Sequence, residues 1–126
     1  MKELLLVGTG GFFGSVLRYL AGAAFLRTFP DARFPWATFA VNISGCLAIG
    51  VIASILERTG SYNSELRLLL VTGVLGGFTT FSAFGLETLH LLRGQHIGLG
   101  VFNAVSSVAL GVFAVWVGFK LGARAG

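Results

Sequence analysis

Four apolar runs divide the chain, and each is long enough to cross a lipid bilayer as a helix. A transmembrane helix needs about 20 mostly apolar residues to span a hydrocarbon core of about 30 Å. The runs extend over residues 4–26, 36–56, 66–92 and 97–121, and short polar connections separate them. The sequence therefore predicts an all-α integral membrane protein, with residues 1–126 forming a single domain of four transmembrane helices.

Charged residues are scarce in this chain. They make up 11% of it and the mean hydropathy is +0.85, whereas a soluble domain carries about 25% charged residues because its surface faces water. The net charge of +4 raises the question of nucleic acid. Proteins that bind nucleic acid gather Lys and Arg on one face, but here these residues stand one or two at a time between apolar runs. We therefore expect lipid, and no nucleic acid, as a partner.

The distribution of Lys and Arg gives little preference for one orientation in the membrane. The count of these residues beside the helix ends sets topology. With four spans, five of them lie on one side and three on the other, or four if Arg18 within span one is included. The two groups are Lys2, Arg58, Arg67, Lys120 and Arg124 against Arg27, Arg33 and Arg93. A chain so nearly balanced is expected to insert in both orientations.

Small residues in span one indicate close helix contacts. Gly10, Gly14, Arg18 and Gly22 recur at four-residue spacing along one face, and small residues at this spacing let membrane helices approach closely. Four short helices enclose little space by themselves, because their centre is filled by packing. Larger transporters often contain repeats of inverted topology, and two copies of one chain in opposite orientations could supply the same symmetry. The sequence therefore favours an antiparallel homodimer, in which Gly10, Gly14 and Arg18 are structural.

Span three is unusual at its centre. Gly76-Gly77 and Thr79-Thr80 weaken the helix at a depth where broken backbone is tolerated only inside protein or beside a wet cavity. A break there would free carbonyl oxygens that can bind a cation. Alternatively, the glycines allow close packing and the threonines hydrogen-bond back to the preceding turn. Both interpretations stay open from the sequence.

Polar and aromatic residues inside the spans are the candidates for an ion path. Asn42 offers two N–H donors to an anion, or else a hydrogen bond to another helix. Phe78, Phe81 and Phe84 follow at three-residue spacing and so lie along one stripe of the helix. Their ring edges carry positive charge that can face an anion, although such a stripe also suits a core or lipid-facing surface.

Span four and the ionisable residues add further candidates. Asn103, Ser107 and Gly111 have four-residue spacing and form a polar face for a narrow path or for helix contact. Arg18 and Glu87 are costly in hydrocarbon, so they are functional candidates unless they pair or reach the interface. The chain shows no nucleophile–base pair, catalytic carboxylate pair or phosphate loop, and an enzyme is not expected.

Four stretches together resemble the Fluc (CrcB-like) family of fluoride channels, over essentially the whole chain. They are GGFFGSVLRY at 10–19, TFAVNISG at 38–45, GVLGGFTTFSAF at 73–84, and the polar track of span four. The third stretch is the most specific, because a glycine pair, a threonine pair and spaced phenylalanines do not recur together in ordinary membrane helices. The residues Ala83, Gly85, Gly111, Cys46 and Asn103 depart from the usual family pattern.

The resemblance implies a dual-topology homodimer in the bacterial inner membrane that exports fluoride passively. It implies that Asn42 donates to fluoride, that Phe81 and Phe84 line its route edge-on, and that one sodium ion lies at the dimer centre. The backbone carbonyls of Gly76 and Thr79 from each subunit would hold this ion. With the polar and aromatic candidates, the expected fluoride pathway comprises Asn42, Phe78, Thr80, Phe81, Ser82, Phe84, Glu87, Asn103 and Ser107.

The alternative is a small dual-topology transporter of drugs or other cations, which has a similar length and number of spans. Such proteins rely on a glutamate within their first span. This chain carries Arg18 there and no internal carboxylate. The alternative is therefore less favoured than the fluoride channel.

Overall fold

Four long helices make up the structure, which is a computed structural model describing residues 1–61 and 64–126. They are α1 (Lys2–Thr28), α2 (Trp36–Arg58), a composite third span (Glu65–Arg93) and α6 (Ile97–Arg124). Each is long and apolar enough to cross a membrane. The predicted all-α membrane fold is confirmed. The largest difference from the expected bounds lies at the end of α6, at residue 124 rather than 121.

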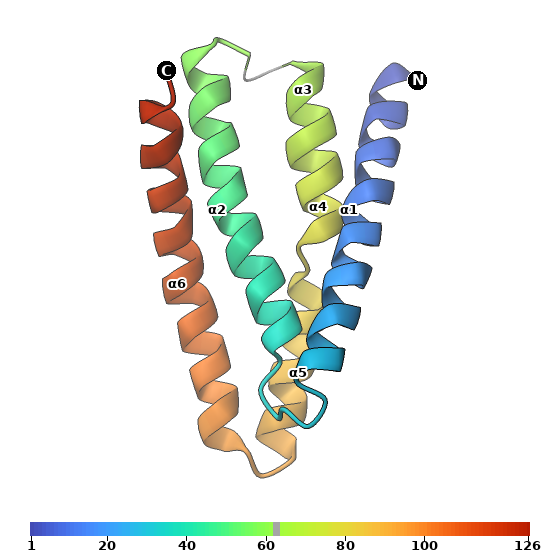
Figure 1. The fold of residues 1–126 in the computed structure, drawn as a ribbon, viewed down its shortest axis with the longest axis vertical. Coiled ribbons are helices and arrows are strands. Elements are labelled where there is room, and N and C mark those ends of the chain that lie inside the picture. The colour runs from blue at the N-terminus through green and yellow to red at the C-terminus, as the bar shows by residue number, and fades with distance from the viewer. Residues whose placement is uncertain (62–63) are drawn as a thin grey trace.

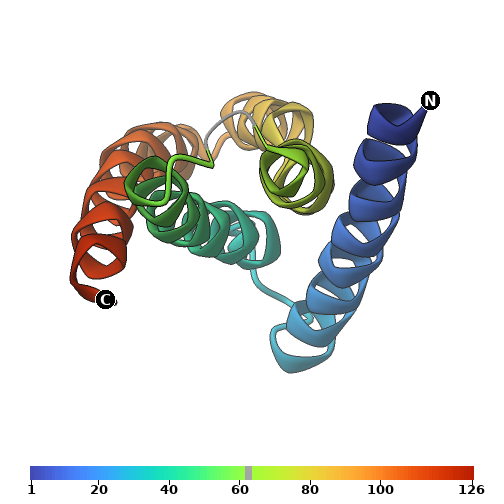
Figure 2. The ribbon, with the colours of Figure 1, turned by 90° about the horizontal axis from the view of Figure 1, so that it is seen from above.

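The helices alternate in direction, as Figure 1 shows. The two termini and the connection from α2 to the third span lie at one end, and the other two connections lie at the opposite end. The connection between spans two and three includes residues 62 and 63, which lie outside the described residues. Viewed from above, α1 packs against the third span, while α6 packs along α2 (Figure 2).

The third span consists of several pieces in line. It begins with α3 (Glu65–Arg67), continues as a π-helix, η1 (Leu68–Leu75), and then as α4 (Gly76–Phe78). Helical geometry stops at Thr79 and Thr80, whose φ and ψ angles are −82° and 157°, and −150° and 118°. The chain then re-enters a helix, α5 (Phe81–Arg93). The predicted break is confirmed, whereas the π-helix was not predicted.

Glycines bring α1 against the third span at backbone contact. A Cβ added to Gly10 or Gly14 would collide with the carbonyl oxygens of Leu69 or Val74, respectively. Gly77 approaches α1 in the same way, because its Cβ would lie 2.5 Å from the carbonyl oxygen of Gly11. The structural role predicted for Gly10 and Gly14 agrees with this packing. Gly22 is different, since a Cβ there would meet no atom within 4 Å.

A second glycine seam, which the sequence analysis did not identify, joins α2 to α6. Added Cβ atoms on Gly50 and Gly118 would collide with the carbonyl oxygens of Val115 and Leu47, and one on Gly122 would come within 2.6 Å of that of Val51. Helices that meet backbone to backbone gain dispersion contacts without a large apolar core. The buried apolar side chains are correspondingly few: Phe34, Val41, Leu56, Leu75, Leu91 and Ala114.

Candidate functional site

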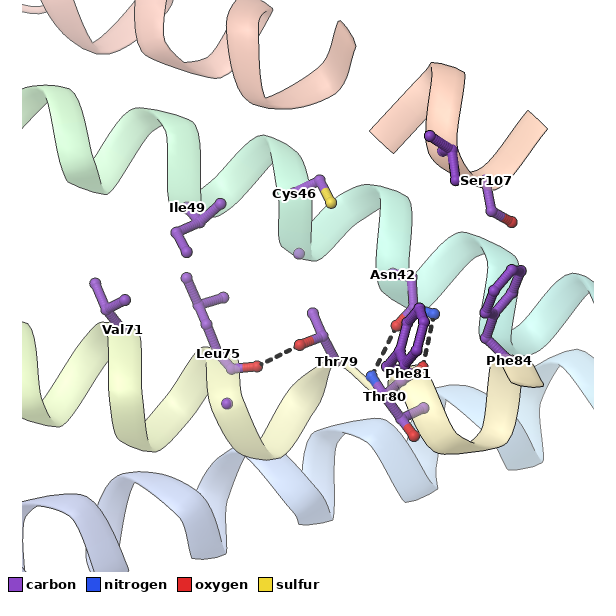
Figure 3. Close-up of a pocket in the computed structure, with 13 residues that line it drawn as sticks. Asn42, Cys46, Ile49, Val71, Leu75, Thr79, Thr80, Phe81, Phe84 and Ser107 are labelled. Carbon is purple, nitrogen blue, oxygen red and sulfur yellow. Dashed lines mark hydrogen bonds between the residues drawn. The ribbon is translucent and has the colours of Figure 1, made fainter. Parts of the chain in front are cut away.

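A cavity of about 370 Å³ lies beside the break in the third span. Its polar lining comes from α2, the break and α6, as Figure 3 shows. Asn42 and Cys46 contribute from α2, Thr79 and Thr80 from the break, and Ser107 from α6. Most of the remaining lining is apolar and includes Phe81 and Phe84. The fold thus brings together most of the predicted pathway at the one point where the membrane helices are interrupted.

Asn42 holds the broken backbone directly. Its Nδ2 donates to the carbonyl oxygen of Thr80 at 2.9 Å, and its Oδ1 accepts from the Thr80 N–H at 2.8 Å. The amide therefore pairs with both backbone groups of one residue, as a neighbouring peptide unit would (Figure 3). The interhelical hydrogen bond expected as one role of Asn42 is confirmed. Because Nδ2 carries two hydrogens, one N–H remains for another acceptor.

Because of these hydrogen bonds and the break, two backbone carbonyl groups lack the N–H donors that they would have in a continuous helix. In a continuous helix, Gly76 O would accept from the N–H of Thr80 and Thr79 O from the N–H of Ala83. Instead, Thr80 donates to Asn42, and Ala83 donates to the Thr80 hydroxyl at 3.2 Å. Carbonyl oxygens released by an unwound membrane helix are typical ligands of sodium. Gly76 and Thr79 both line the cavity, so this pair fits the predicted cation site.

The two alternatives considered for the threonines are both present. Thr79 bonds back to the preceding turn, since its hydroxyl donates to Leu75 O at 2.9 Å. Thr80 instead accepts from Ala83 and so caps the start of α5. In the described parts of the chain, no group of three His, Cys, Asp or Glu side chains is placed to hold a metal.

The phenylalanines divide at the break. Phe81 and Phe84 remain neighbours, with ring centroids 5.6 Å apart and planes inclined by 39°, and 84% of Phe81 is exposed. Phe78 ends α4, on the other side of Thr79 and Thr80, and does not line the cavity. The single stripe expected for all three was wrong, because the break at Thr79 and Thr80 separates Phe78 from the other two. Phe81 therefore lies both on the cavity wall and on the outer surface of this subunit.

The polar face of α6 contributes one residue to the cavity. Ser107 lines it, whereas Asn103 is only 1% exposed and lies outside it. Asn103 Nδ2 donates to the Thr88 hydroxyl at 2.9 Å, and its Oδ1 accepts from Ser107 at 3.3 Å. Thr88 in turn donates to the carbonyl oxygen of Phe84 at 2.7 Å. Asn103 thus joins α6 to α5 and orients Ser107, and it has no access to the cavity in this subunit.

Gly111 and Ser82 both lie near the cavity. Gly111 is buried and faces α2, where an added Cβ would lie 3.5 Å from Cys46 Sγ. The glycine therefore leaves room beside the thiol. Ser82 is exposed and lies 3.4 Å from the Thr80 hydroxyl, oxygen to oxygen, but is not part of the cavity wall.

Arg18 and Glu87 do not pair with each other. Arg18 borders a smaller cavity of about 160 Å³ together with Thr38 and Thr80. Thr38 also donates its hydroxyl hydrogen to Glu87 Oε1 at 2.8 Å, while Glu87 Oε2 is buried without a hydrogen-bond partner among the described residues. Thr38 therefore stands between the two ionisable residues. Thr38 was not among the predicted site residues, although it lies one helical turn before Asn42 and shares its face.

Comparison with known proteins finds relatives along nearly the whole chain. The family described as "CrcB-like protein, Camphor Resistance (CrcB)" matches residues 5–119. A protein of Methylobacillus flagellatus named "Fluoride-specific ion channel FluC" is 47% identical over 121 residues, covering 96% of this chain and 94% of the relative. A protein of Rhizobium leguminosarum bv. trifolii with the same name is 50% identical over 122 residues, covering 96% of each chain. The chain therefore belongs to the CrcB-like family.

Proposed function

We propose that this chain is the subunit of a fluoride-selective channel in the bacterial inner membrane, through which cytoplasmic fluoride leaves passively. The observation that carries the proposal is the broken third span, where amide, hydroxyl and aromatic groups line one cavity at the membrane interior. Full-length relatives named fluoride-specific ion channels support the choice of anion. An ion that enters as the weak acid and ionises inside would leave down its gradient without an energy source.

Fluoride needs donors that replace its water. We assign this task to the remaining N–H of Asn42 and to the positive ring edges of Phe81 and Phe84, which all line the cavity. Ser107 lies on the same wall, and its hydroxyl would donate to the ion in place of Asn103 Oδ1. Thr80, Ser82 and the start of α5 lie beside the same point, where the helix dipole adds positive potential. The pathway would continue past Glu87, while Phe78 and Asn103 support its walls.

The proposal includes a second copy of the chain in the opposite orientation. Interrupted backbone at the bilayer centre is tolerated only where protein or water covers it, and the polar cavity of one subunit is bordered by a Phe81 ring that is 84% exposed. The balance of Lys and Arg, five against three or four, allows the inverted copy to insert. An antiparallel homodimer would cover the break of each subunit with the other.

A sodium ion at the centre of this dimer is part of the proposal. The Gly76 and Thr79 carbonyls of each subunit would hold it, since both have lost their helical donors to Asn42 and Thr80. When bound, the ion supplies a fixed positive charge and ties the two broken helices together. The chain's own part is to keep these carbonyls free, and Asn42 does so by occupying the Thr80 N–H.

Efflux from proteoliposomes tests the proposed function. Purified protein is reconstituted into vesicles loaded with fluoride or chloride, and release is followed with ion-selective electrodes after a potassium ionophore collapses the membrane potential. We expect rapid fluoride release and chloride release no faster than from protein-free vesicles. Equal release of both anions would contradict fluoride selectivity. Transport of an organic cation without fluoride release would instead favour the small multidrug transporter.

A further inference from the structure

A third cavity, of about 290 Å³, lies at the end of the helices where α1 meets α2 and α5 meets α6. Its ionisable lining comes from three segments: Arg33 from the connection before α2, Glu87 and His90 from α5, and His96 from the connection before α6. Pro35 and Leu91 complete the wall. Three of the four ionisable groups are cations or become cations on protonation.

The turn between α5 and α6 puts both histidines on this wall. Gly94 donates its N–H to His90 O at 2.9 Å, and His96 donates its N–H to Leu91 O at 2.9 Å. Gln95 between them adopts a positive φ of 63°, which folds the chain back over the end of α5. His90 also lies three residues after Glu87, so the two side chains share one face of the helix. His90 and His96 therefore line the same wall as Glu87.

Shared wall residues connect this cavity to the broken helix. Glu87 lines it and accepts a hydrogen bond from Thr38, which lines the cavity that contains Arg18. Thr80 lines both that second cavity and the one at the break. The three cavities thus follow one another from the end of the helices to the membrane centre, and Glu87 with Thr38 separates the first from the second.

We propose that the cavity bounded by Arg33, His90 and His96 is an antechamber that collects small anions for the path past Glu87. Proton uptake by its two imidazoles increases the number of anions that it collects. This inference rests on the proposed fluoride conduction. The lining holds one permanent cation, Arg33, and one carboxyl group, Glu87, and protonation of both imidazoles adds two positive charges to it. The remaining charged groups at this end are Arg27, Asp31 and Arg93, which lie outside the lining, and Arg18, which lies in the next cavity.

The chemistry of histidine sets the pH range of this response. Histidine is the side chain that ordinarily changes charge between about pH 5 and 8. Two unit charges roughly 6 Å from a passing anion, in water at physiological salt, raise its local concentration about threefold. The antechamber therefore supplies more anion when the solution that it faces is acidic.

Fluoride efflux at two pH values tests the antechamber. Proteoliposomes of the whole protein are measured at pH 7.5 and 5.5 with fluoride well below saturation, and the leak of protein-free vesicles is subtracted at each pH. We expect the protein-dependent rate to rise about threefold at pH 5.5 and the rise to grow at lower salt, because screening weakens. At saturating fluoride the rise should disappear, because collection of the anion then no longer limits the rate.

Three variants separate the antechamber from other effects of acid. The double variant His90→Gln, His96→Gln should lose the rise, and Arg33→Gln should lower the sub-saturating rate at both pH values. Arg93→Gln removes a cation at the same end but outside the lining, so it should retain the rise. Size-exclusion profiles establish that each variant is assembled.

Each outcome decides between the two proposals. A threefold rise that survives in the double histidine variant overturns the antechamber and leaves fluoride conduction standing. The absence of any rise in the unmodified protein also overturns the antechamber and leaves fluoride conduction standing. A rate equal to that of protein-free vesicles at both pH values overturns fluoride conduction and the antechamber together.

Discussion

Replacing Asn42 by Asp changes the hydrogen bonding of the broken helix while preserving the size of the side chain. The carboxyl group still accepts from the Thr80 N–H, as Oδ1 does at 2.8 Å. It loses the donor that now reaches Thr80 O at 2.9 Å, and it loses the second N–H that we assign to fluoride. One substitution thus removes both donors and introduces an anion at the proposed site.

The expected magnitudes differ for stability and for conduction. Hydrogen bonds between membrane helices contribute about 0.6 kcal/mol on average, and an unsatisfied buried carbonyl costs about 1–3 kcal/mol. The variant should therefore lose about 1–3 kcal/mol of stability and still assemble. A carboxylate about 4 Å from a passing anion raises its energy by about 4 kcal/mol at an effective dielectric constant of 20. Fluoride efflux should consequently fall by at least tenfold.

The assay measures efflux, dimer formation and thermal aggregation on the same preparations. Ser44→Ala is the matched control, because Ser44 lies two residues away on α2, bonds to Val41 O of its own helix at 3.0 Å, and does not line the cavity. It should leave the efflux rate unchanged. Efflux of the Asn42→Asp variant within twofold of the unmodified protein would refute the donor role and leave Asn42 as a structural clamp only.

Two further predictions concern the aromatic pair and the glycine seam. Phe81→Ile removes the positive ring edge of an 84% exposed side chain, so efflux should fall several-fold with little change in thermal aggregation; loss of both in parallel would indicate a packing role. Gly14→Ala should destabilise the protein by about 1–3 kcal/mol through overpacking against Val74, measured by thermal aggregation, whereas Gly22→Ala in the same helix should be tolerated; equal effects would contradict the glycine contact.

The membrane fold and the break were predictable because both depend on local sequence. Length and apolarity decide which segments cross the bilayer, and short polar connections force neighbouring spans to run antiparallel. The Gly76-Gly77 and Thr79-Thr80 pairs mark the weak point of span three with side chains that favour leaving the helix. The structure places the interruption at the two threonines.

The partners of the polar residues could not be predicted, because they depend on how far one helix slides along another. That register is set where backbones touch, as at Gly10 and Gly14, and no local pattern reveals which carbonyl lies opposite. This register decides that Thr38 meets Glu87 and that Asn103 is buried outside the cavity. The π-helix of η1 has no sequence signal that we can identify.

If the active channel is an inverted pair, fluoride efflux requires subunits in both orientations. Two variants, each biased by basic residues toward one orientation, test this requirement directly. Thr59→Lys with Ser61→Lys gives one end seven basic residues (5 + 2) against three at the other, or four with Arg18. The opposite form, Arg58→Ser and Arg124→Ser with Thr28→Lys, Asp31→Lys and Ala32→Lys, gives three (5 − 2) against six (3 + 3), or seven with Arg18. Lysine content beside the spans should fix each form in one orientation.

Fluoride efflux is then measured from cells and vesicles containing either form alone or both together. A cysteine introduced near Lys2, in a background without Cys46, reports the orientation of each form through labelling by an impermeant maleimide. The account predicts that neither uniformly oriented form releases fluoride and that co-expression restores fluoride release without chloride release. Full fluoride efflux from one uniformly oriented form alone would contradict the inverted pair.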